Sequence, residues 1–67
     1  MAKIQLNGKK ISIKSNFTVQ DLLKKYKLVN KKVAIEHNGI IIPKVSYKKK
    51  YLNDNDKVEI VHFIGGG

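Results

Sequence analysis

Apolar and polar residues alternate near the start of the chain, over residues 4–6 (IQL) and again over residues 11–13 (ISI). A period of two puts every second side chain on the same face of a strand, so both runs are expected to form strands with one buried face. Asn7 and Gly8 lie between the two runs. This dipeptide favours a type I′ turn, which needs two residues that tolerate positive φ. The pattern therefore predicts a β-hairpin as the first element.

The period changes to that of a helix over residues 18–28. Apolar residues there recur at the i, i+3, i+4 and i+7 positions that share one helix face: Val19, Leu22, Leu23 and Tyr26. Thr18 is a suitable N-cap, and Asp21 stands three residues later, as in a capping box with Asp in place of Glu. The segment is predicted to be a helix whose apolar stripe covers the hairpin.

Two further short strands are predicted within residues 31–43 (KKVAIEHNGIIIP). Asn38 and Gly39 give a second tight turn, and Pro43 ends the second of these strands because it lacks a backbone N–H. Residues 44–51 follow neither period and are expected to form an irregular crossover with up to one turn of helix.

A last strand is predicted from Lys57 to about Phe63, after a turn rich in Asp and Asn. Asn55 in that turn is expected to adopt the left-handed conformation that Gly adopts more easily. The element order predicts an α+β roll, with one main helix on a mixed sheet of about five strands. A right-handed crossover places the last strand beside the first, in the middle of the sheet.

The chain of 67 residues is long enough for one domain. A domain of this size buries only about 60% of its unfolded surface, which leaves little room for a deep catalytic cleft and favours a binding, carrier or adaptor protein over an enzyme. The absence of Cys excludes a disulfide framework, a thiolate metal site and a Cys nucleophile. The sequence shows no apolar leader and no stretch of membrane-spanning length, so a cytoplasmic protein is expected.

The formal net charge is +9, carried by 14 Lys without any Arg. Such a charge allows binding to nucleic acid or to acidic partners, but Arg is the preferred residue for recognition of phosphate and guanine. The Lys residues are therefore interpreted as a solvated surface, and no nucleic-acid partner is expected.

Few residues are candidates for side-chain chemistry. His37 and His62 are the only histidines of the sequence, its acidic residues are scattered, and no pair has the spacing of a metal site. Both histidines are expected on strand surfaces. No Ser stands in the pattern of a hydrolase triad. Neither a catalytic residue nor a metal or cofactor is expected.

The last strand combines a buried face with a second apolar face. If Val58 and Ile60 face the helix, alternation sends Val61 and Phe63 to the opposite face, where polar residues are usual. Exposed apolar side chains of this kind indicate docking of a partner. The alternative is that the strand end is covered by the chain itself, near residues 40–42.

The sequence ends in three glycines, Gly65 to Gly67. Because Gly has no Cβ, such a segment can be threaded through a channel too narrow for side chains. Its terminal carboxylate can then accept an adenylyl group from ATP and be attacked by a nucleophile. The alternative is a frayed or artificial end.

The whole chain resembles the ubiquitin-like β-grasp sulfur carriers, and among them the ThiS family of thiamine biosynthesis. The resemblance covers about the full length and lies in four stretches: the Asn7-Gly8 hairpin, TVQDLL (18–23), VAIEHNGIIIP (33–43) and LNDNDKVEIVHFIGGG (52–67). Asn55 departs from the family pattern, which has Gly there. Asn tolerates the same backbone region, so the turn is expected to survive.

The resemblance implies a carrier whose chemistry takes place at Gly67. An E1-like, ThiF-like enzyme would adenylate its carboxylate, a sulfurtransferase would supply persulfide sulfur, and a ThiG-like thiazole synthase would consume the thiocarboxylate. The domain would comprise residues 1–64 and the tail residues 65–67, in a chain that is monomeric when free. Gly65 and Gly66 would thread through the partner enzymes, and the docking surface would include Val61, Phe63 and Ile64.

Three other functions stay open from the sequence. The chain could carry sulfur for another pathway, such as molybdopterin or a sulfur amino acid. It could be a ubiquitin-like modifier that is attached to target lysines through Gly67. It could also be a small lysine-rich nucleic-acid-binding module, which the lack of Arg and of an aromatic platform argues against.

Overall fold

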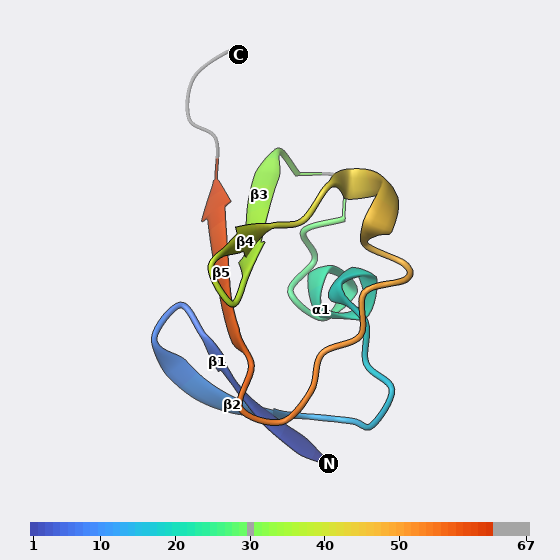
Figure 1. Cartoon of the computed structure of the whole chain (residues 1–67). Helices are drawn as coiled ribbons and strands as arrows, with labels where there is room; N and C mark the ends of the chain where they lie inside the picture. The colour runs from blue at the N-terminus through green and yellow to red at the C-terminus, as the bar shows by residue number, and fades with distance from the viewer. Residues whose placement is uncertain (30, 63–67) are drawn as a thin grey trace.

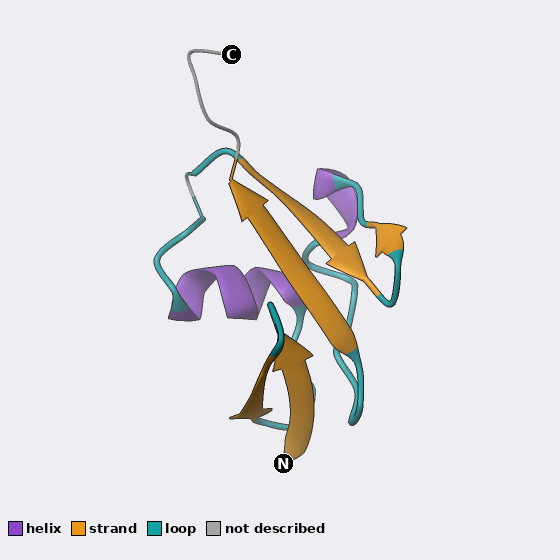
Figure 2. Cartoon of the chain, turned by 90° about the vertical axis from the view of Figure 1, so that its left-hand side faces the viewer, coloured by secondary structure: helices purple, strands orange, loops and turns teal. Residues whose placement is uncertain are grey.

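The computed structural model describes residues 1–29 and 31–62 of the chain. Within them, the elements follow in this order: β1 (Ala2–Leu6), β2 (Lys9–Ile13), α1 (Val19–Lys25), β3 (Val33–His37), β4 (Ile40–Ile41), the 3₁₀ helix η1 (Lys44–Ser46) and β5 (Lys57–His62). The strands form one sheet, and α1 lies against one of its faces (Figures 1 and 2). The predicted α+β fold, with one main helix on a mixed sheet, is confirmed.

The sheet has five strands in the order β2-β1-β5-β3-β4. β5 runs parallel to β1, with Gln5 opposite Lys57 and Leu6 opposite Val58. It runs antiparallel to β3 along all of β3, from His37 opposite Val58 to Val33 opposite His62. The last strand therefore lies beside the first and in the middle of the sheet, as predicted.

Both predicted Asn-Gly turns are present. Asn7 and Gly8 have φ values of 48° and 84°, and Asn38 and Gly39 have φ values of 52° and 85°. Positive φ at both central residues is what a type I′ turn requires. A Cβ added to Gly8 or Gly39 would meet no atom within 4 Å, so backbone conformation rather than crowding favours Gly at these positions.

Helix α1 begins as predicted and ends earlier. The Thr18 hydroxyl accepts a hydrogen bond from the Asp21 N–H at 3.1 Å, and the Asp21 carboxylate accepts one from the Thr18 N–H at 3.0 Å, which is the predicted capping box. The helix ends at Lys25, three residues before the predicted end, because Lys27 adopts a left-handed φ of 58°. The Leu28 N–H then bonds to the Leu23 carbonyl at 2.7 Å, the long bond of a Schellman motif.

The segment after β4 holds the start of α1. The Val19 N–H donates to the Lys50 carbonyl at 2.9 Å, and the Gln20 N–H donates to the Tyr47 carbonyl at 3.0 Å. These are first-turn N–H groups that have no partner inside the helix. Helix η1 is the one turn of helix predicted within residues 44–51.

The core lies between the sheet and α1. Val19, Leu22 and Leu23 of the predicted helix stripe are buried, whereas Tyr26 at the helix end is 41% exposed. The buried apolar residues that meet these three helix residues come from the strands and the long crossover: Ile4, Ile13, Ile35, Ile42, Tyr47, Leu52, Val58 and Ile60. The opposite face of the sheet is left without a covering element among the described residues (Figure 2).

Candidate functional site

The end of β5 is the described part of the chain nearest to the glycine tail. Val58 and Ile60 are buried at 0% and 8% exposure, while Val61 is 54% exposed. The predicted alternation along this strand is therefore confirmed. Phe63, Ile64, Gly65, Gly66 and Gly67 lie outside the described residues, so the site predicted for them stays a prediction.

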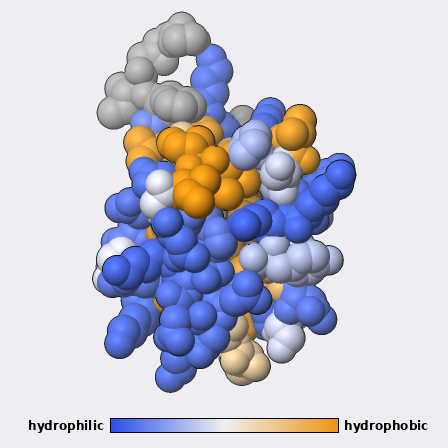
Figure 3. All heavy atoms as spheres, in the orientation of Figure 1, coloured by the Kyte–Doolittle hydropathy of each residue, from blue (hydrophilic) through white to orange (hydrophobic). Residues whose placement is uncertain are grey.

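The apolar surface around Val61 continues onto the neighbouring strands. Val61 lies opposite Ala34 of β3, and Ile41 of β4 lies opposite Glu36 on the same face of the sheet. Ile40 and Ile41 are 67% and 62% exposed. Figure 3 shows hydrophobic residues gathered over β4 and the end of β5. The described chain leaves Val61 open rather than covering it with residues 40–42.

The Asn7 side chain fixes β5 where its pairing with β1 ends. The Asn7 Oδ1 accepts a hydrogen bond from the Ile60 N–H at 2.7 Å, and the Asn7 Nδ2 donates to the Ile60 carbonyl at 3.2 Å. The backbone N–H of Asn7 also donates to the Val58 carbonyl at 2.9 Å. Asn7 thus extends the parallel pairing of β1 with β5 by one residue beyond Leu6. The sequence predicted the turn but not this second role of Asn7.

His37 is buried, and the prediction that it lies on a strand surface is wrong. It is 8% exposed, and its Nε2 donates to the Asp56 Oδ2 at 2.7 Å. The reason is the strand period, since His37 has the same parity as the buried Ile35. The signal that could have located it is this parity, together with an acidic residue in the turn before the last strand. His62, the other histidine, is exposed as predicted.

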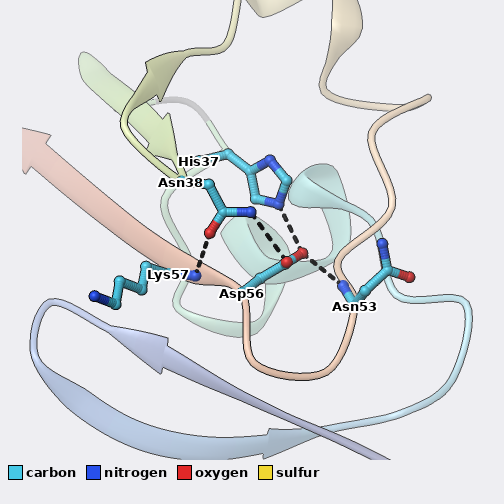
Figure 4. Close-up of polar contacts among 5 residues, drawn as sticks. All are labelled: His37, Asn38, Asn53, Asp56 and Lys57. Atoms are coloured by element: carbon cyan, nitrogen blue, oxygen red, sulfur yellow. Dashed lines mark hydrogen bonds and ion pairs between the residues drawn. The ribbon is translucent and has the colours of Figure 1, made fainter.

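Asp56 is the centre of a buried polar network (Figure 4). Its Oδ2 also accepts from the Asn53 N–H at 2.7 Å, and its Oδ1 accepts from the Asn38 Nδ2 at 3.1 Å. The Asn38 Oδ1 in turn accepts from the Lys57 N–H at 2.8 Å. The network joins the β3–β4 turn to the start of β5, at the opposite end of that strand from the tail.

The hydrogen bonds decide the ionisation of Asp56. Burial alone would raise the pKa of its carboxyl, but the hydrogen bonds from His37, the Asn53 backbone and Asn38 outweigh burial and lower the pKa below its ordinary value. Asp56 is therefore an ionised acceptor at neutral pH. Three donors of the network point at this carboxylate, and the Asn38 side chain passes the network on to the Lys57 backbone, so the network fixes the fold between the β3–β4 turn and β5.

Neither a metal site nor a membrane-spanning helix is found in the described part of the chain. No three His, Cys, Asp or Glu residues of residues 1–29 and 31–62 are grouped to hold a metal ion. None of the helices in these ranges is long and apolar enough to cross a membrane.

Comparison with known proteins identifies the family. The model of the ThiS family matches residues 3–67, which is nearly the whole chain. The chain belongs to the ThiS family. The predicted family is confirmed, and with it the predicted class, a sulfur carrier protein rather than an enzyme.

Two named relatives support the assignment to this family. The sulfur carrier protein ThiS of Bacillus subtilis is 51% identical over 65 residues, which cover 96% of this chain and 98% of that protein. The crystal structure of a thiamine biosynthesis protein (ThiS) from Geobacter metallireducens superimposes with a TM-score of 0.83 at 28% identity, covering 97% of this ThiS-family chain and 99% of the other. The β-grasp fold of the family is therefore confirmed as well.

A third relative combines this fold with an enzyme. A thiazole synthase of Paramagnetospirillum magneticum is 45% identical over 65 residues, which cover 97% of this chain but 20% of that protein. A segment like the ThiS-family chain thus occurs within a longer thiazole synthase polypeptide.

Proposed function

We propose that the carboxylate of Gly67 is the group on which this ThiS-family carrier holds sulfur for formation of the thiazole ring in thiamine biosynthesis. The folded part, residues 1–64, presents the carboxylate, and residues 65–67 form the arm that reaches into the active sites of other enzymes.

The observation that carries the proposal is the absence of Cys from the sequence of a sulfur carrier. Transferable sulfur in proteins is normally held on a thiolate, and this chain has none. The single Met holds its sulfur in a thioether, which does not donate it. A carboxylate that exchanges one oxygen for sulfur is the group that remains, and the chain end supplies one without a side chain beside it.

The loading reaction needs ATP and an activated sulfur. Attack of the Gly67 carboxylate on the α-phosphate of ATP gives an acyl adenylate and releases pyrophosphate. The terminal sulfur of a persulfide on a sulfurtransferase then displaces AMP and forms an acyl disulfide. Reduction of its S–S bond by a thiol leaves the thiocarboxylate. All catalytic groups of these steps belong to the partner enzymes, so the carrier contributes the carboxylate and its reach.

Three partners follow from this chemistry: a ThiF-like adenylating enzyme, a sulfurtransferase and a thiazole synthase. The thiazole synthase polypeptide that contains a similar segment supports the last of these. Val61, which is 54% exposed near the end of β5, supports a docking surface that also includes Phe63 and Ile64. We place the carrier with these enzymes in the cytoplasm.

The test is ATP-dependent formation of a thiocarboxylate. The protein is incubated with the purified adenylating enzyme, a sulfurtransferase with its sulfur donor, and ATP, and is then treated with a thiol alkylator. Because the chain has no Cys, an alkylated C-terminal peptide in the mass spectrum reports sulfur at Gly67. A variant without Gly66 and Gly67, and a reaction without ATP, are the controls and should stay unmodified.

An unmodified Gly67, under conditions in which a known ThiS carrier is converted, would reject the proposal. Isopeptide-linked adducts in a cell extract would instead assign the chain to the ubiquitin-like modifiers. Formation of thiazole after addition of thiazole synthase would separate the thiamine pathway from the molybdopterin and sulfur amino acid pathways.

A further inference from the structure

The lysines of this chain are unevenly distributed. Between Asp21 and Glu36 the sequence has five Lys and no acidic residue, and between Glu36 and Asp54 it has four more, again without an acidic residue. These two segments include the end of α1, the loop that leads to β3, and helix η1 with the turn after it. The positive charge of the protein is therefore concentrated in two stretches of the chain.

The fold brings the two stretches together on the side of the sheet that α1 covers (Figure 1). The loop before β3 and helix η1 border one hollow of about 490 Å³, and three lysines line it: Lys31, Lys32 and Lys44. Its other lining residues carry no charge: Leu23, Val29, Val33 and Tyr47. The lysines are exposed, whereas Leu23 and Tyr47 are buried. The hollow thus has a cationic rim and an apolar floor, and no carboxylate belongs to its lining.

Exposed apolar side chains accompany these lysines. Val29 lines the hollow and is 38% exposed, and Val45 follows Lys44 in η1 and is 85% exposed. Apolar contacts surrounded by a polar and charged rim are the usual composition of a protein interface. We call the surface formed by Val29, Lys31, Lys32, Lys44 and Val45 the basic patch.

The chemistry of loading brings two enzymes to one carboxylate. The acyl adenylate at Gly67 is a mixed anhydride that water hydrolyses, so the persulfide has to attack it while the adenylating enzyme still shields it. The sulfurtransferase then meets a carrier whose tail and whose docking surface at the end of β5 are already occupied. It needs a second surface of the carrier. The basic patch is separate from that docking surface, because it lies on the α1 side of the sheet and Val61 lies on the opposite face.

We propose that the basic patch binds an acidic surface of the sulfurtransferase, with carboxylates of that enzyme on Lys31 and Lys44 and an apolar side chain on Val29 and Val45. The proposal rests on the proposed function and adds a second docking surface to it. Carboxylates fit because lysines that share a hollow repel one another until an opposite charge lies between them. Charge complementarity of this kind also speeds the encounter of two proteins and orients it.

Charge and composition disfavour other occupants of the basic patch. A second copy of the chain would bring a net charge of +9 against the same net charge. A nucleic acid is held best by Arg and by aromatic side chains on which bases stack. The chain has no Arg, and Tyr47, the aromatic residue of the hollow, is only 7% exposed.

The test measures the affinity of the full chain for the purified sulfurtransferase by isothermal titration calorimetry, with and without a saturating amount of the adenylating enzyme. Lys31→Glu/Lys44→Glu should weaken binding about 10- to 100-fold in both conditions and make it less sensitive to salt. The same variant should bind the adenylating enzyme alone as tightly as the wild type does. Val45→Ser should weaken binding of the sulfurtransferase about 3- to 10-fold at every salt concentration, because it removes an apolar contact and no charge.

Lys10→Glu/Lys14→Glu is the matched control, because it changes the net charge equally at two lysines outside the patch. Its affinity for the sulfurtransferase should change much less. All four lysines are exposed, so both double variants should keep a Tm close to that of the wild type.

Equal affinity of Lys31→Glu/Lys44→Glu and the wild type would overturn the proposal, as would an equal loss in the control variant or failure of the sulfurtransferase to bind the wild type. Displacement of the sulfurtransferase by the adenylating enzyme would also overturn it. Patch-dependent binding to vesicles that contain phosphatidylglycerol, without binding to the sulfurtransferase, would assign the patch to a membrane instead. The thiocarboxylate assay on the wild type runs in parallel. A thiocarboxylate at Gly67 with unaffected patch variants rejects this proposal alone, whereas its absence rejects the proposed function.

Discussion

Substitution of Asp56 by Asn should remove a large part of the stability of this domain. The carboxylate accepts hydrogen bonds from His37, Asn53 and Asn38 and is 9% exposed. An Asn side chain has one oxygen in place of two, so its amide group has to face one of these donors. If the oxygen of the new Asn stays between His37 and Asn53, its NH₂ group faces the Nδ2 of Asn38, and two donors meet. The Asn38 side chain cannot turn its oxygen toward the new NH₂ group without losing the hydrogen bond from the Lys57 N–H.

The loss can be estimated from these contacts. Hydrogen bonds to charged groups contribute about 1.5–3 kcal/mol each, and a buried donor without an acceptor costs about 1–3 kcal/mol. The variant loses one such bond and the charge on the others, so we expect a loss of about 2–4 kcal/mol. A domain of 67 residues has a free energy of unfolding of roughly 3–10 kcal/mol, so the variant loses about a fifth of it or more. The corresponding decrease in Tm is roughly 10–30 °C.

The assay is unfolding by urea and by heat, followed by far-ultraviolet circular dichroism at neutral pH. Asp54→Asn is the control, since Asp54 is exposed and the Asn oxygen can still accept from the Lys3 N–H. Its free energy of unfolding should stay within about 0.5 kcal/mol of the wild type. A loss for Asp56→Asn that is as small as the control's would refute the assignment of the network as the clamp between the β3–β4 turn and β5.

Further outcomes are expected for the same domain. The pKa of Asp56 in the folded state lies below its unfolded value, so its stabilisation is complete above about pH 4 and is lost as the pH falls through the folded value. The free energy of unfolding should therefore depend less on pH in acid for Asp56→Asn than for the wild type. Part of the pH dependence should remain in the variant, because the Thr18 backbone N–H lowers the pKa of Asp21 as well. Thr18→Ala should cost about 1 kcal/mol in urea unfolding, and Thr18→Ser should restore most of it. Asn7→Gly keeps a residue that tolerates positive φ but removes both side-chain hydrogen bonds to Ile60. Hydrogen exchange should therefore accelerate at the Ile60 amide, while the amides of the β1–β2 hairpin stay protected. Val61→Asp should leave the Tm within a few degrees of the wild type and weaken binding of thiazole synthase, and unchanged binding would remove Val61 from the docking surface.

Elements with local chemical signals could be predicted from the sequence. The two Asn-Gly turns and the capping box of Thr18 and Asp21 depend on residues within three positions of each other, and the structure has all of them. The end of α1 was predicted too late because Lys27 adopts a left-handed conformation that no local signal indicates. Glycine is the usual residue there, and the Schellman bond from Leu28 compensates for its absence.

Contacts between distant segments could not be predicted in the same way. The bonds between Asn7 and Ile60 join residues 53 positions apart, and the bond between His37 and Asp56 spans 19 positions. Their existence depends on β5 entering the sheet between β1 and β3, which the sequence predicts only as a topology. The alternation along the strands did place Val61 on the outer face. The tail itself was recognised from its composition and from the family resemblance, and its residues lie beyond the described part of β5.

The two hairpin turns show how the fold serves a function at the chain end. Each turn Asn uses its side chain to bind the backbone of β5, Asn38 at Lys57 and Asn7 at Ile60. The strand is therefore held from its first residue on by both neighbours, and it stays paired with β3 up to His62. The segment that leads to Gly67 follows His62 in the sequence, so the last described residue before it is fixed relative to both faces of the sheet. On the proposed function, a partner that binds this end of β5 meets the carrier at a defined position, which is what a carrier that relies on the catalytic groups of other enzymes has to supply.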